Sequence, residues 1–265
     1  MSDIHINDPA KNSVKIWRKY FQKKLLKEDF DIIVIAGDIA SHKQKDLNTF
    51  FHLLRQFFPT IKVFWVKGNH DFYDKKSWLH GSFSQELRAH KPRTREWTYQ
   101  KMLQYHKELS KKYNLIHLDG TFEELNKNIV LFGFDGWYGY TPNTNDELMI
   151  PDELKDHSLL RNKAHNDLNN ILLQIDQYYK DEKIIKICLT HFPPYTFQPQ
   201  YRHMIANENY LKFIAEEFDF LLLGHSHRDE DWYFKNCHII NTGCDYNIPQ
   251  SKIVDVLTNN VKTIK

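Results

Sequence analysis

"KVFWVKGNHD" (residues 62–71) begins as an apolar run and ends in a cluster of polar side chains. A short run of β-branched and aromatic residues of this kind is typical of a buried strand. The same order recurs in "DIIVIAGD" (31–38), "KIIKICLTH" (183–191) and "FDFLLLGHSH" (218–227). Ligands of open α/β sheets bind outside the carboxyl ends of the strands. We therefore expect the polar residues of these stretches to lie along one edge of a sheet.

Segments with helical spacing alternate with the strand-like runs. Apolar residues recur at intervals of three and four from Val14 to Leu25, from Leu47 to Leu54 and from Leu168 to Ile175. Strands that alternate with helices predict an α/β layered fold. No repeat or Pro/Gly/Ser-rich linker divides the chain, so residues 1–265 are expected to form a single domain. The charged and aromatic stretch at 72–112 is expected to be a lid-like excursion from it.

Composition narrows the class of protein. The 265 residues are 41% apolar and 14% aromatic, which is enough for a substantial core. Because 36 Lys and Arg face 34 Asp and Glu, charge gives no general case for binding nucleic acid or a membrane surface. The three cysteines lack paired spacing, which fits a reducing cytoplasm better than a disulfide framework. No membrane-spanning stretch or signal peptide is recognisable, and we predict a cytoplasmic protein.

A set of polar residues at strand ends and near the N-terminus is suited to binding metal. The set comprises Asp3, His5, Asp38, Asn69, His70, His191, His225 and His227. Asp3 and His5 are two residues apart, so in an extended segment both side chains point the same way. Carboxylate, imidazole and amide without thiolate suit a pair of transition-metal ions better than calcium or a structural zinc. Even without His70, the remaining seven are too many ligands for one ion, and Asp38 is the best candidate for the carboxylate that bridges two.

The order of these motifs resembles that of the calcineurin-like metallophosphoesterases, especially their smaller bacterial members. The family's pattern is matched by "DIH", "GD", "GNHD", "TH" and "GHSH", and the resemblance extends from Asp3 to about Gly243. It implies an α/β fold, a layered sandwich of two mixed β-sheets flanked by helices. It also implies that Asp3, His5 and His227 hold one metal ion and that Asp38 bridges it to a second.

The resemblance assigns the second ion to Asn69, His191 and His225. The implied cofactor is two divalent metal ions, with Mn expected and Fe, Zn or Ni also compatible. His70 would contact the phosphate or protonate the leaving oxygen, with Asp71 as a modulator of its pKa. The implied activity is hydrolysis of a phosphomonoester or phosphodiester, because a paired metal site turns water into a nucleophile at neutral pH.

Two departures from the family's pattern bear on this expectation. A full apolar strand usually precedes the D-x-H motif, whereas only Met1 and Ser2 do so here. We expect either a natural polypeptide that begins further upstream, which we favour, or a first strand cut to a stub, with Asp3 on a fraying end.

The second departure concerns the substrate. In the branch of the family that acts on phosphoproteins, GD extends into GDxxDRG. The sequence here is "GDIASHKQ" (37–44), which argues against phosphoprotein substrates.

The expected substrate is a small phosphorylated molecule, with nucleotide-like compounds among the candidates. Trp137, Tyr138 and Tyr140 near "GFDGW" (133–137) are candidates to stack on a base or sugar. "RAHKPRTREW" (88–97) has two interpretations. It is either a solvated charged loop, which we favour slightly, or part of a lid whose Arg93 and Arg95 engage phosphate.

Two other functions remain open on the sequence. The first is a nuclease that acts on DNA or RNA ends, since DNA exonucleases of the resembled family also carry GNHD. The near-neutral charge and the lack of an evident DNA-binding domain disfavour it. The second is a non-enzymatic protein-binding scaffold on the same fold. The complete set of candidate ligands argues against it.

Overall fold

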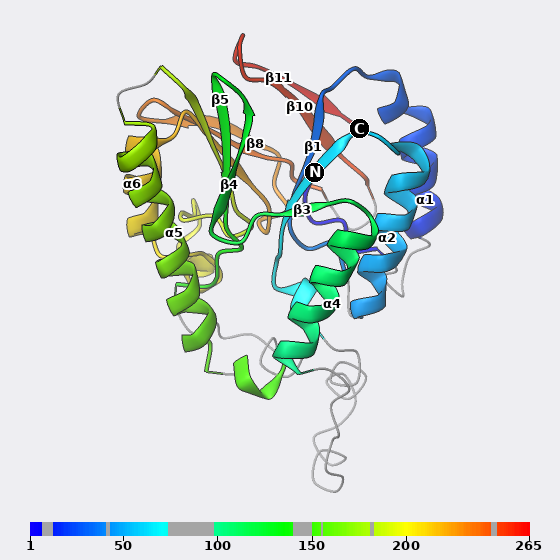
Figure 1. Ribbon diagram of the computed structural model, residues 1–265, viewed down its shortest axis with the longest axis horizontal. Coiled ribbons are helices and arrows are strands. Elements are labelled where there is room, and N and C mark those ends of the chain that lie inside the picture. Colours follow the sequence, from blue (N-terminus) through cyan, green and yellow to red (C-terminus); the bar gives the residue numbers. More distant parts are fainter. Residues whose placement is uncertain are drawn as a thin grey trace, which may run out of the picture.

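Two β-sheets lie face to face at the centre of the molecule, and helices cover their outer faces (Figure 1). The computed structural model describes residues 1–6, 13–40, 43–73, 98–139, 150–154, 156–180, 183–244 and 248–265. The larger sheet is mixed, with order β4-β5-β6-β7-β9-β8, and the smaller has order β1-β2-β3 with parallel pairing. A separate antiparallel hairpin, β10-β11, follows. The predicted α/β layered sandwich is confirmed.

The strand bounds agree with the apolar runs of the sequence. The smaller sheet consists of β1 (Ile32–Ala36), β2 (Lys62–Val66) and β3 (Ile116–His117). The larger consists of β4 (Thr121–Asn126), β5 (Ile129–Gly133), β6 (Ile185–Leu189), β7 (Phe220–Leu223), β8 (Glu230–Phe234) and β9 (Cys237–Asn241). The hairpin consists of β10 (Ser251–Asp255) and β11 (Asn260–Ile264).

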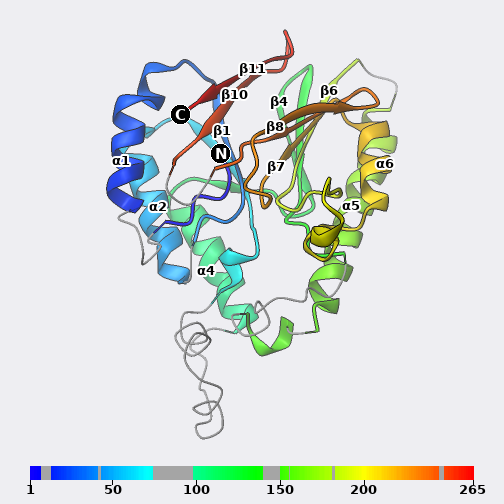
Figure 2. The same cartoon turned by 180° about the vertical axis from the view of Figure 1, so that it is seen from behind.

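The helices form the two outer layers (Figures 1 and 2). The smaller sheet is covered by α1 (Ser13–Lys23), α2 (Gln44–Phe57) and α4 (Tyr99–Lys112). The larger sheet is covered by α5 (Ser158–Tyr178) and α6 (Asn209–Glu217). In the part of the chain that the structure describes, no helix combines the length and apolar character needed to cross a membrane.

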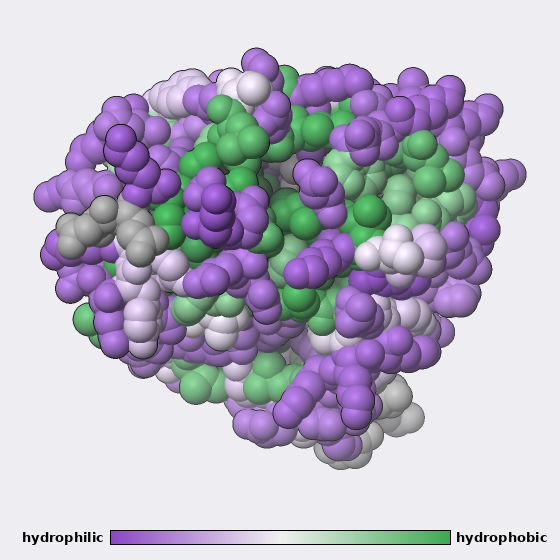
Figure 3. Space-filling model, turned by 45° about the horizontal axis from the view of Figure 1, so that its top comes forward, coloured by the Kyte–Doolittle hydropathy of each residue, from purple (hydrophilic) through white to green (hydrophobic). Residues whose placement is uncertain are grey.

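Three apolar clusters fill the spaces between these layers. One lies between the smaller sheet and its helices and includes Phe21, Phe50 and Trp65. A second joins the larger sheet to α5 and α6, and a third, with Phe64 and Leu189, lies between the sheets. On the face seen in Figure 3, apolar side chains gather in the middle and hydrophilic ones surround them. Each of the two sheets is thus packed against its own layer of helices.

The prediction of an excursion at 72–112 is wrong for the part of this stretch that forms helix α4. Its residues Tyr99, Met102, His106 and Leu109 are buried, and α4 contacts α2 and β3. Their spacing of three and four places them on one face, which packs into the scaffold. The stretch 99–112 is therefore part of the body of the fold. Residues 74–97 lie outside the described residues, and a lid there remains a prediction.

The N-terminal segment runs beside β1 and is fixed to it by backbone hydrogen bonds. The Ala36 N–H donates to the Met1 carbonyl at 2.8 Å, and the Asp3 N–H donates to Gly37 at 3.1 Å. The His5 N–H donates to the Asp38 carbonyl at 3.0 Å. Asp3 and His5 are 0% and 1% exposed, so Asp3 does not lie on a fraying end. The segment carries two candidate ligands directly to the loop that carries Asp38.

A buried ion pair connects the two sheets behind the strand ends. The Lys67 ammonium, after β2, lies 2.9 Å from the Asp135 carboxylate, after β5. The same carboxylate accepts the Lys67 backbone N–H at 2.8 Å and lies 2.8 Å from His117 Nε2. Burial opposes ionisation of Asp135, but Lys67 and His117 outweigh it and hold the pKa of its carboxyl well below the usual range. Because the His191 N–H donates to the Asp135 carbonyl at 3.4 Å, the pair also connects to β6.

Removing one partner of this pair should destabilise the protein strongly. In Lys67→Met, the Asp135 carboxylate stays buried without its ammonium, and we expect the free energy of unfolding to fall by about 3–5 kcal/mol. The double variant Lys67→Met/Asp135→Asn should recover much of that loss, because no isolated charge remains buried. Urea unfolding of the two single variants and the double variant measures this coupling.

The matched control is an ion pair on the surface. Lys235 and Glu216 lie 2.8 Å apart, with side chains 45% and 43% exposed. Lys235→Met should change the free energy of unfolding by less than about 1 kcal/mol. A loss in Lys67→Met no larger than that of the control would contradict the role of the buried pair.

Candidate metal centre

The predicted ligands converge at the carboxyl ends of strands from both sheets. Asp38 follows β1, Asn69 and His70 follow β2, His191 follows β6, and His225 and His227 follow β7. With Asp3 and His5 from the N-terminal segment, this makes the complete set that the sequence indicated. All of them are buried except His70 and His227, which are partly exposed. Loops from two sheets thus supply one site.

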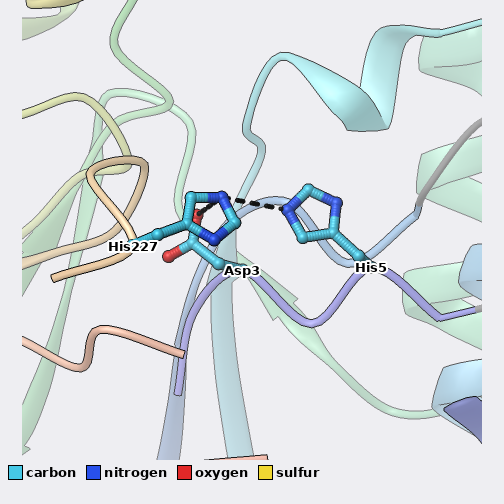
Figure 4. Close-up of side chains that lie close together, drawn as sticks. All are labelled: Asp3, His5 and His227. Atoms are coloured by element: carbon cyan, nitrogen blue, oxygen red, sulfur yellow. Dashed lines mark hydrogen bonds and ion pairs between the residues drawn. The ribbon is translucent and has the colours of Figure 1, made fainter. Parts of the chain in front are cut away.

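Asp3, His5 and His227 form the first cluster of donor atoms (Figure 4). His5 Nε2 lies 3.4 Å from His227 Nε2, and the two rings stack with centroids 5.1 Å apart. His227 Nε2 lies 3.7 Å from Asp3 Oδ1. The same oxygen is anchored by the backbone, since it accepts the His225 N–H at 2.9 Å. The three side chains therefore point at a common position.

Asp38, His191 and His225 form the second cluster. His191 Nε2 lies 3.2 Å from His225 Nδ1 and 3.4 Å from Asp38 Oδ2. Asp38 Oδ2 also lies 3.8 Å from His5 Nε2, which belongs to the first cluster. One carboxylate oxygen is therefore adjacent to histidines of both clusters. This is the position that a bridging ligand must occupy.

The donor atoms of the two clusters are arranged as metal ligands rather than as hydrogen-bond partners of one another. Asp3 Oδ2 and Asn69 Oδ1 are buried and have no hydrogen-bond partner among the described residues. Buried polar atoms are almost always paired, so these two oxygens on candidate ligands indicate a missing partner. The separations of 3.2–3.8 Å lie within or up to 0.3 Å above the roughly 3.0–3.5 Å between adjacent ligands at metal–ligand bonds of about 2.1 Å. Imidazole, carboxylate and amide oxygen suit Mn, Fe, Zn or Ni.

Neighbouring groups fix the orientation of the ligands. His191 Nδ1 lies 2.7 Å from the Ala36 carbonyl, so this nitrogen donates and Nε2 is left as the ligand atom. Asn69 Nδ2 donates to the Tyr73 hydroxyl at 2.7 Å, which directs Asn69 Oδ1 towards the site. Ligand orientation therefore does not depend on the ligands alone.

Asp71 has a structural role in the site, whereas the sequence indicated it as a modulator of the pKa of His70. Its carboxylate accepts the N–H groups of Ile39 and Ala40 at 3.0 and 2.8 Å and that of Gly68 at 2.9 Å. It therefore ties the loop after β1 to the loop after β2. Burial, with the Asp38 carboxylate adding to it, raises the pKa of Asp71 to about 7.

The electrostatics of the second cluster centre on an ion pair between Asp38 and His191. Burial alone would lower the pKa of His191, but Asp38 above all raises it to about 9. Burial alone would raise the pKa of the Asp38 carboxyl, but His191, with His70, holds it well below its usual range. Burial, followed by the charge of His191, lowers the pKa of His225 to about 3. Burial thus favours a neutral His225, while the raised pKa of His191 lets this histidine neutralise the Asp38 anion.

The close approach of the loops requires unusual backbone. Five of the predicted ligands have positive φ, namely Asp3 (52°), His5 (45°), Asp38 (52°), His225 (69°) and His227 (54°). Such strain in residues other than glycine gathers at functional sites. A Cβ on Gly68 would lie 2.1 Å from Asp38 Oδ1 and 2.7 Å from His191 Nε2. Glycine at this position is therefore required by the packing of the ligands.

The residues predicted to contact substrate do not lie with the predicted metal ligands around a common position. Trp137 is 1% exposed, and its indole N–H donates to His157 Nδ1 at 3.0 Å. Tyr138 is also buried, with its ring 5.5 Å from that of His225. Both rings belong to the core that supports the site, so the prediction that they stack on substrate is corrected. Arg93, Arg95 and Tyr140 lie outside the described residues.

The sequence reasoning missed several residues that support the site. His106 Nε2 lies 2.7 Å from Gln44 Oε1, and Gln44 Nε2 donates to the carbonyls of Asp71 and Tyr73 at 2.8 and 3.2 Å. This chain of contacts links α4 through α2 to the loop that carries Asn69. A buried glutamine at the start of a helix is the only signal the sequence gives for it.

A third group of candidate ligands, His117, Asp119 and Asp135, lies apart from the site. Lys67 lies 2.9 Å from Asp135, and Lys163 lies 2.5 Å from Asp119. Each carboxylate is thus already neutralised by a lysine, and the group does not fit a metal ion. It belongs to the ion-pair network between the sheets.

Comparisons with known proteins agree with this geometry. A family model described as calcineurin-like phosphoesterase matches residues 1–229. A comparison with curated proteins gives no match. Among solved structures, the fold is similar to the phosphopantetheinyl hydrolase from Mycobacterium tuberculosis, with a TM-score of 0.61 and 12% identity over 91% of this chain and 86% of that one.

Two further solved structures share the fold. For the protein TT1561 of Thermus thermophilus the TM-score is 0.57, with 12% identity over 94% of this chain and 93% of that one. For a putative 5'-nucleotidase from Staphylococcus aureus the TM-score is 0.51, with 13% identity over 99% of this chain and 51% of that one. At such identities the likeness is one of fold, while the matched family model spans most of the sequence. The chain belongs to the calcineurin-like phosphoesterase family.

Proposed function

We propose that this protein hydrolyses a phosphomonoester or phosphodiester with two divalent metal ions held side by side. The observation that carries the proposal is the position of Asp38 Oδ2, which lies 3.8 Å from His5 Nε2 and 3.4 Å from His191 Nε2. Asp3, His5 and His227 would hold one ion. Asn69, His191 and His225 would hold the other, with Asp38 shared between them.

The ions would supply Lewis acidity and a hydroxide nucleophile at neutral pH. The chain itself would hold the reacting groups in position and exclude water from them. The two anchored carboxylates of Asp3 and Asp38 each accept a backbone N–H at 2.9 Å, so neither must reorganise when substrate arrives. Since His5, His191 and His225 are buried, their charges and dipoles act in a medium of low dielectric constant.

We propose that His70 acts on the substrate. Its backbone N–H donates to Asp38 Oδ1 at 2.9 Å, and its ring lies 4.4 Å from that of His5 and 4.3 Å from that of Tyr73. Its partial exposure lets the imidazole reach a bound phosphate. We assign to it the contact with a phosphoryl oxygen and the transfer of a proton to the leaving oxygen.

Mn is the metal we propose, with Fe, Zn and Ni also compatible with the donor set. The substrate is proposed to be a small phosphorylated molecule, with nucleotide-like compounds among the candidates. The names of two solved structures with the same fold, a phosphopantetheinyl hydrolase and a putative 5'-nucleotidase, support small organic phosphates. The three cysteines are buried and form no disulfide in the part of the chain that the structure describes, which supports the proposed cytoplasmic location.

Neither alternative gains support from a specific observation among the described residues. The complete and preorganised donor set argues against a scaffold that only binds proteins. A nuclease would need a surface for the phosphate backbone, and the chain's formal charge of +2 gives it no general advantage there.

Hydrolysis of p-nitrophenyl phosphate and bis-p-nitrophenyl phosphate should depend on added Mn. In Asp38→Asn the shared carboxylate is lost, and we expect kcat/KM to fall by at least about 10³-fold. In His70→Ala we expect kcat to fall by about 10²–10⁴-fold, because a positioned acid is lost. The preferred substrate distinguishes a monoesterase from a diesterase.

The matched control for these variants is His52→Ala. His52 is exposed on α2 and lies 3.1 Å from Gln56, away from the ligands. Its removal should leave both rates unchanged. Equal activity in the wild type and Asp38→Asn, or the absence of turnover at every metal concentration, would refute the proposal.

Adding one methyl group at Gly68 should weaken metal binding. A Cβ there would meet both Asp38 and His191, so in Gly68→Ala these ligands cannot keep their positions. We expect the Mn affinity, measured by titration calorimetry, to fall by at least about tenfold.

Gly120→Ala serves as the control for strain alone. Gly120 has a φ of 71°, and a Cβ there would lie 2.8 Å from Asp167, remote from the ligands. This variant should lose stability and keep its Mn affinity. Unchanged Mn affinity in Gly68→Ala would mean that the packing around Gly68 does not define the site.

A further inference from the structure

A cavity of about 230 Å³ opens beside the metal centre. His225 and His227 form its inner wall, one from each cluster of ligands. Its outer wall comes from the loop after His191, including Tyr195 and Phe197. A molecule whose phosphate lies on the metal ions would therefore extend its organic part into this cavity. The volume is below the roughly 300 Å³ of sites for drug-sized ligands, which suits one ring system better than a long chain.

The outer wall is an aromatic surface held in a fixed position. Phe197 is 60% exposed, and its ring lies 5.2 Å from that of Trp232 and 5.4 Å from that of Tyr195. The Tyr195 hydroxyl donates to Glu230 at 2.6 Å, and the Trp232 indole N–H donates to that hydroxyl at 3.4 Å. An exposed ring that is already ordered loses little entropy when a ligand covers it. Stacking on such a ring favours flat ligands.

Arg228 adds a positive charge to the same wall. Its backbone N–H donates to Ser226 Oγ at 3.3 Å, which fixes the turn after His227. Its guanidinium makes no hydrogen bond or ion pair within the described residues. Glu230, the acid that shares the cavity, accepts the Tyr195 hydroxyl and feels the charge of Arg228, while burial raises the pKa of its carboxyl and so weakens its negative charge. A guanidinium in this position is suited to bind an anion on the ligand.

We propose that this cavity binds the organic part of the phosphoester, and that this part is a flat aromatic ring with an anionic substituent. Phe197 would stack on the ring and Arg228 would pair with the anion. This inference rests on the proposed function, because the phosphate must lie on the metal pair. It identifies Phe197 and Arg228 as residues that determine specificity.

Binding of phosphonates tests the proposal without turnover. Calorimetry on the Mn-loaded protein would compare methylphosphonate, phenylphosphonate and 4-carboxyphenylphosphonate. We expect the phenyl compound to bind at least about tenfold more tightly than the methyl compound, as one stacked ring allows. The carboxylate should add about fivefold or more through Arg228.

Each variant should remove one of these gains. In Phe197→Ala the preference for phenylphosphonate over methylphosphonate should fall to about twofold or less, with the methylphosphonate Kd unchanged. In Arg228→Gln only the gain from the carboxylate should be lost. Phe213→Ala is the control, because Phe213 is 46% exposed on α6 and does not line the cavity. It should keep all three affinities.

The results separate failure of this inference from failure of the proposed function. If methylphosphonate binds in the presence of Mn but the phenyl compound binds no better, the cavity does not take an aromatic group. A preference that survives Phe197→Ala would also overturn the proposal. If none of the three phosphonates binds, the metal site itself does not hold phosphate, and the proposed function fails together with this inference.

Discussion

The buried carboxylate of Asp38 sets the geometry on which the rest of the site depends. One of its oxygens accepts the His70 N–H at 2.9 Å, and the other lies between His5 and His191. A carboxylate in this position is stable only when positive charge surrounds it. The left-handed backbone at Asp38 and at four other ligands is the cost of bringing these groups together.

Several contacts outside the ligand set maintain that arrangement. The N-terminal segment is hydrogen-bonded to the loop after β1, and Asp71 ties this loop to the one after β2. The Lys67–Asp135 pair connects the two sheets immediately behind them. The strain in the site is therefore balanced by buried polar contacts on both sheets, rather than by the ligands themselves. This explains why residues without contact to substrate should affect metal binding and stability.

The sequence predicted the layered fold, and it pointed to the candidate ligands that the structure brings together, because both depend on local signals. Each apolar run ends at a short polar motif, and parallel strands bring such ends to one edge. The sequence could not predict the burial of Trp137, because His157, its partner, lies twenty residues away in a left-handed conformation. The buried face of α4 was missed because His106, a polar residue, occupies one of its core positions and bonds to Gln44. Arg228 carries no motif of its own, and the role proposed for it rests on its place in the cavity wall.

The most direct test of a paired metal site is Mn titration followed by electron paramagnetic resonance. If Asp38 is shared, the wild-type chain should bind two Mn ions, and the spectrum should show the exchange coupling of adjacent ions, expected at about 3.5–4 Å in such sites. A single Mn per chain, or two ions whose spectra are those of isolated Mn, would contradict a site built around one shared carboxylate.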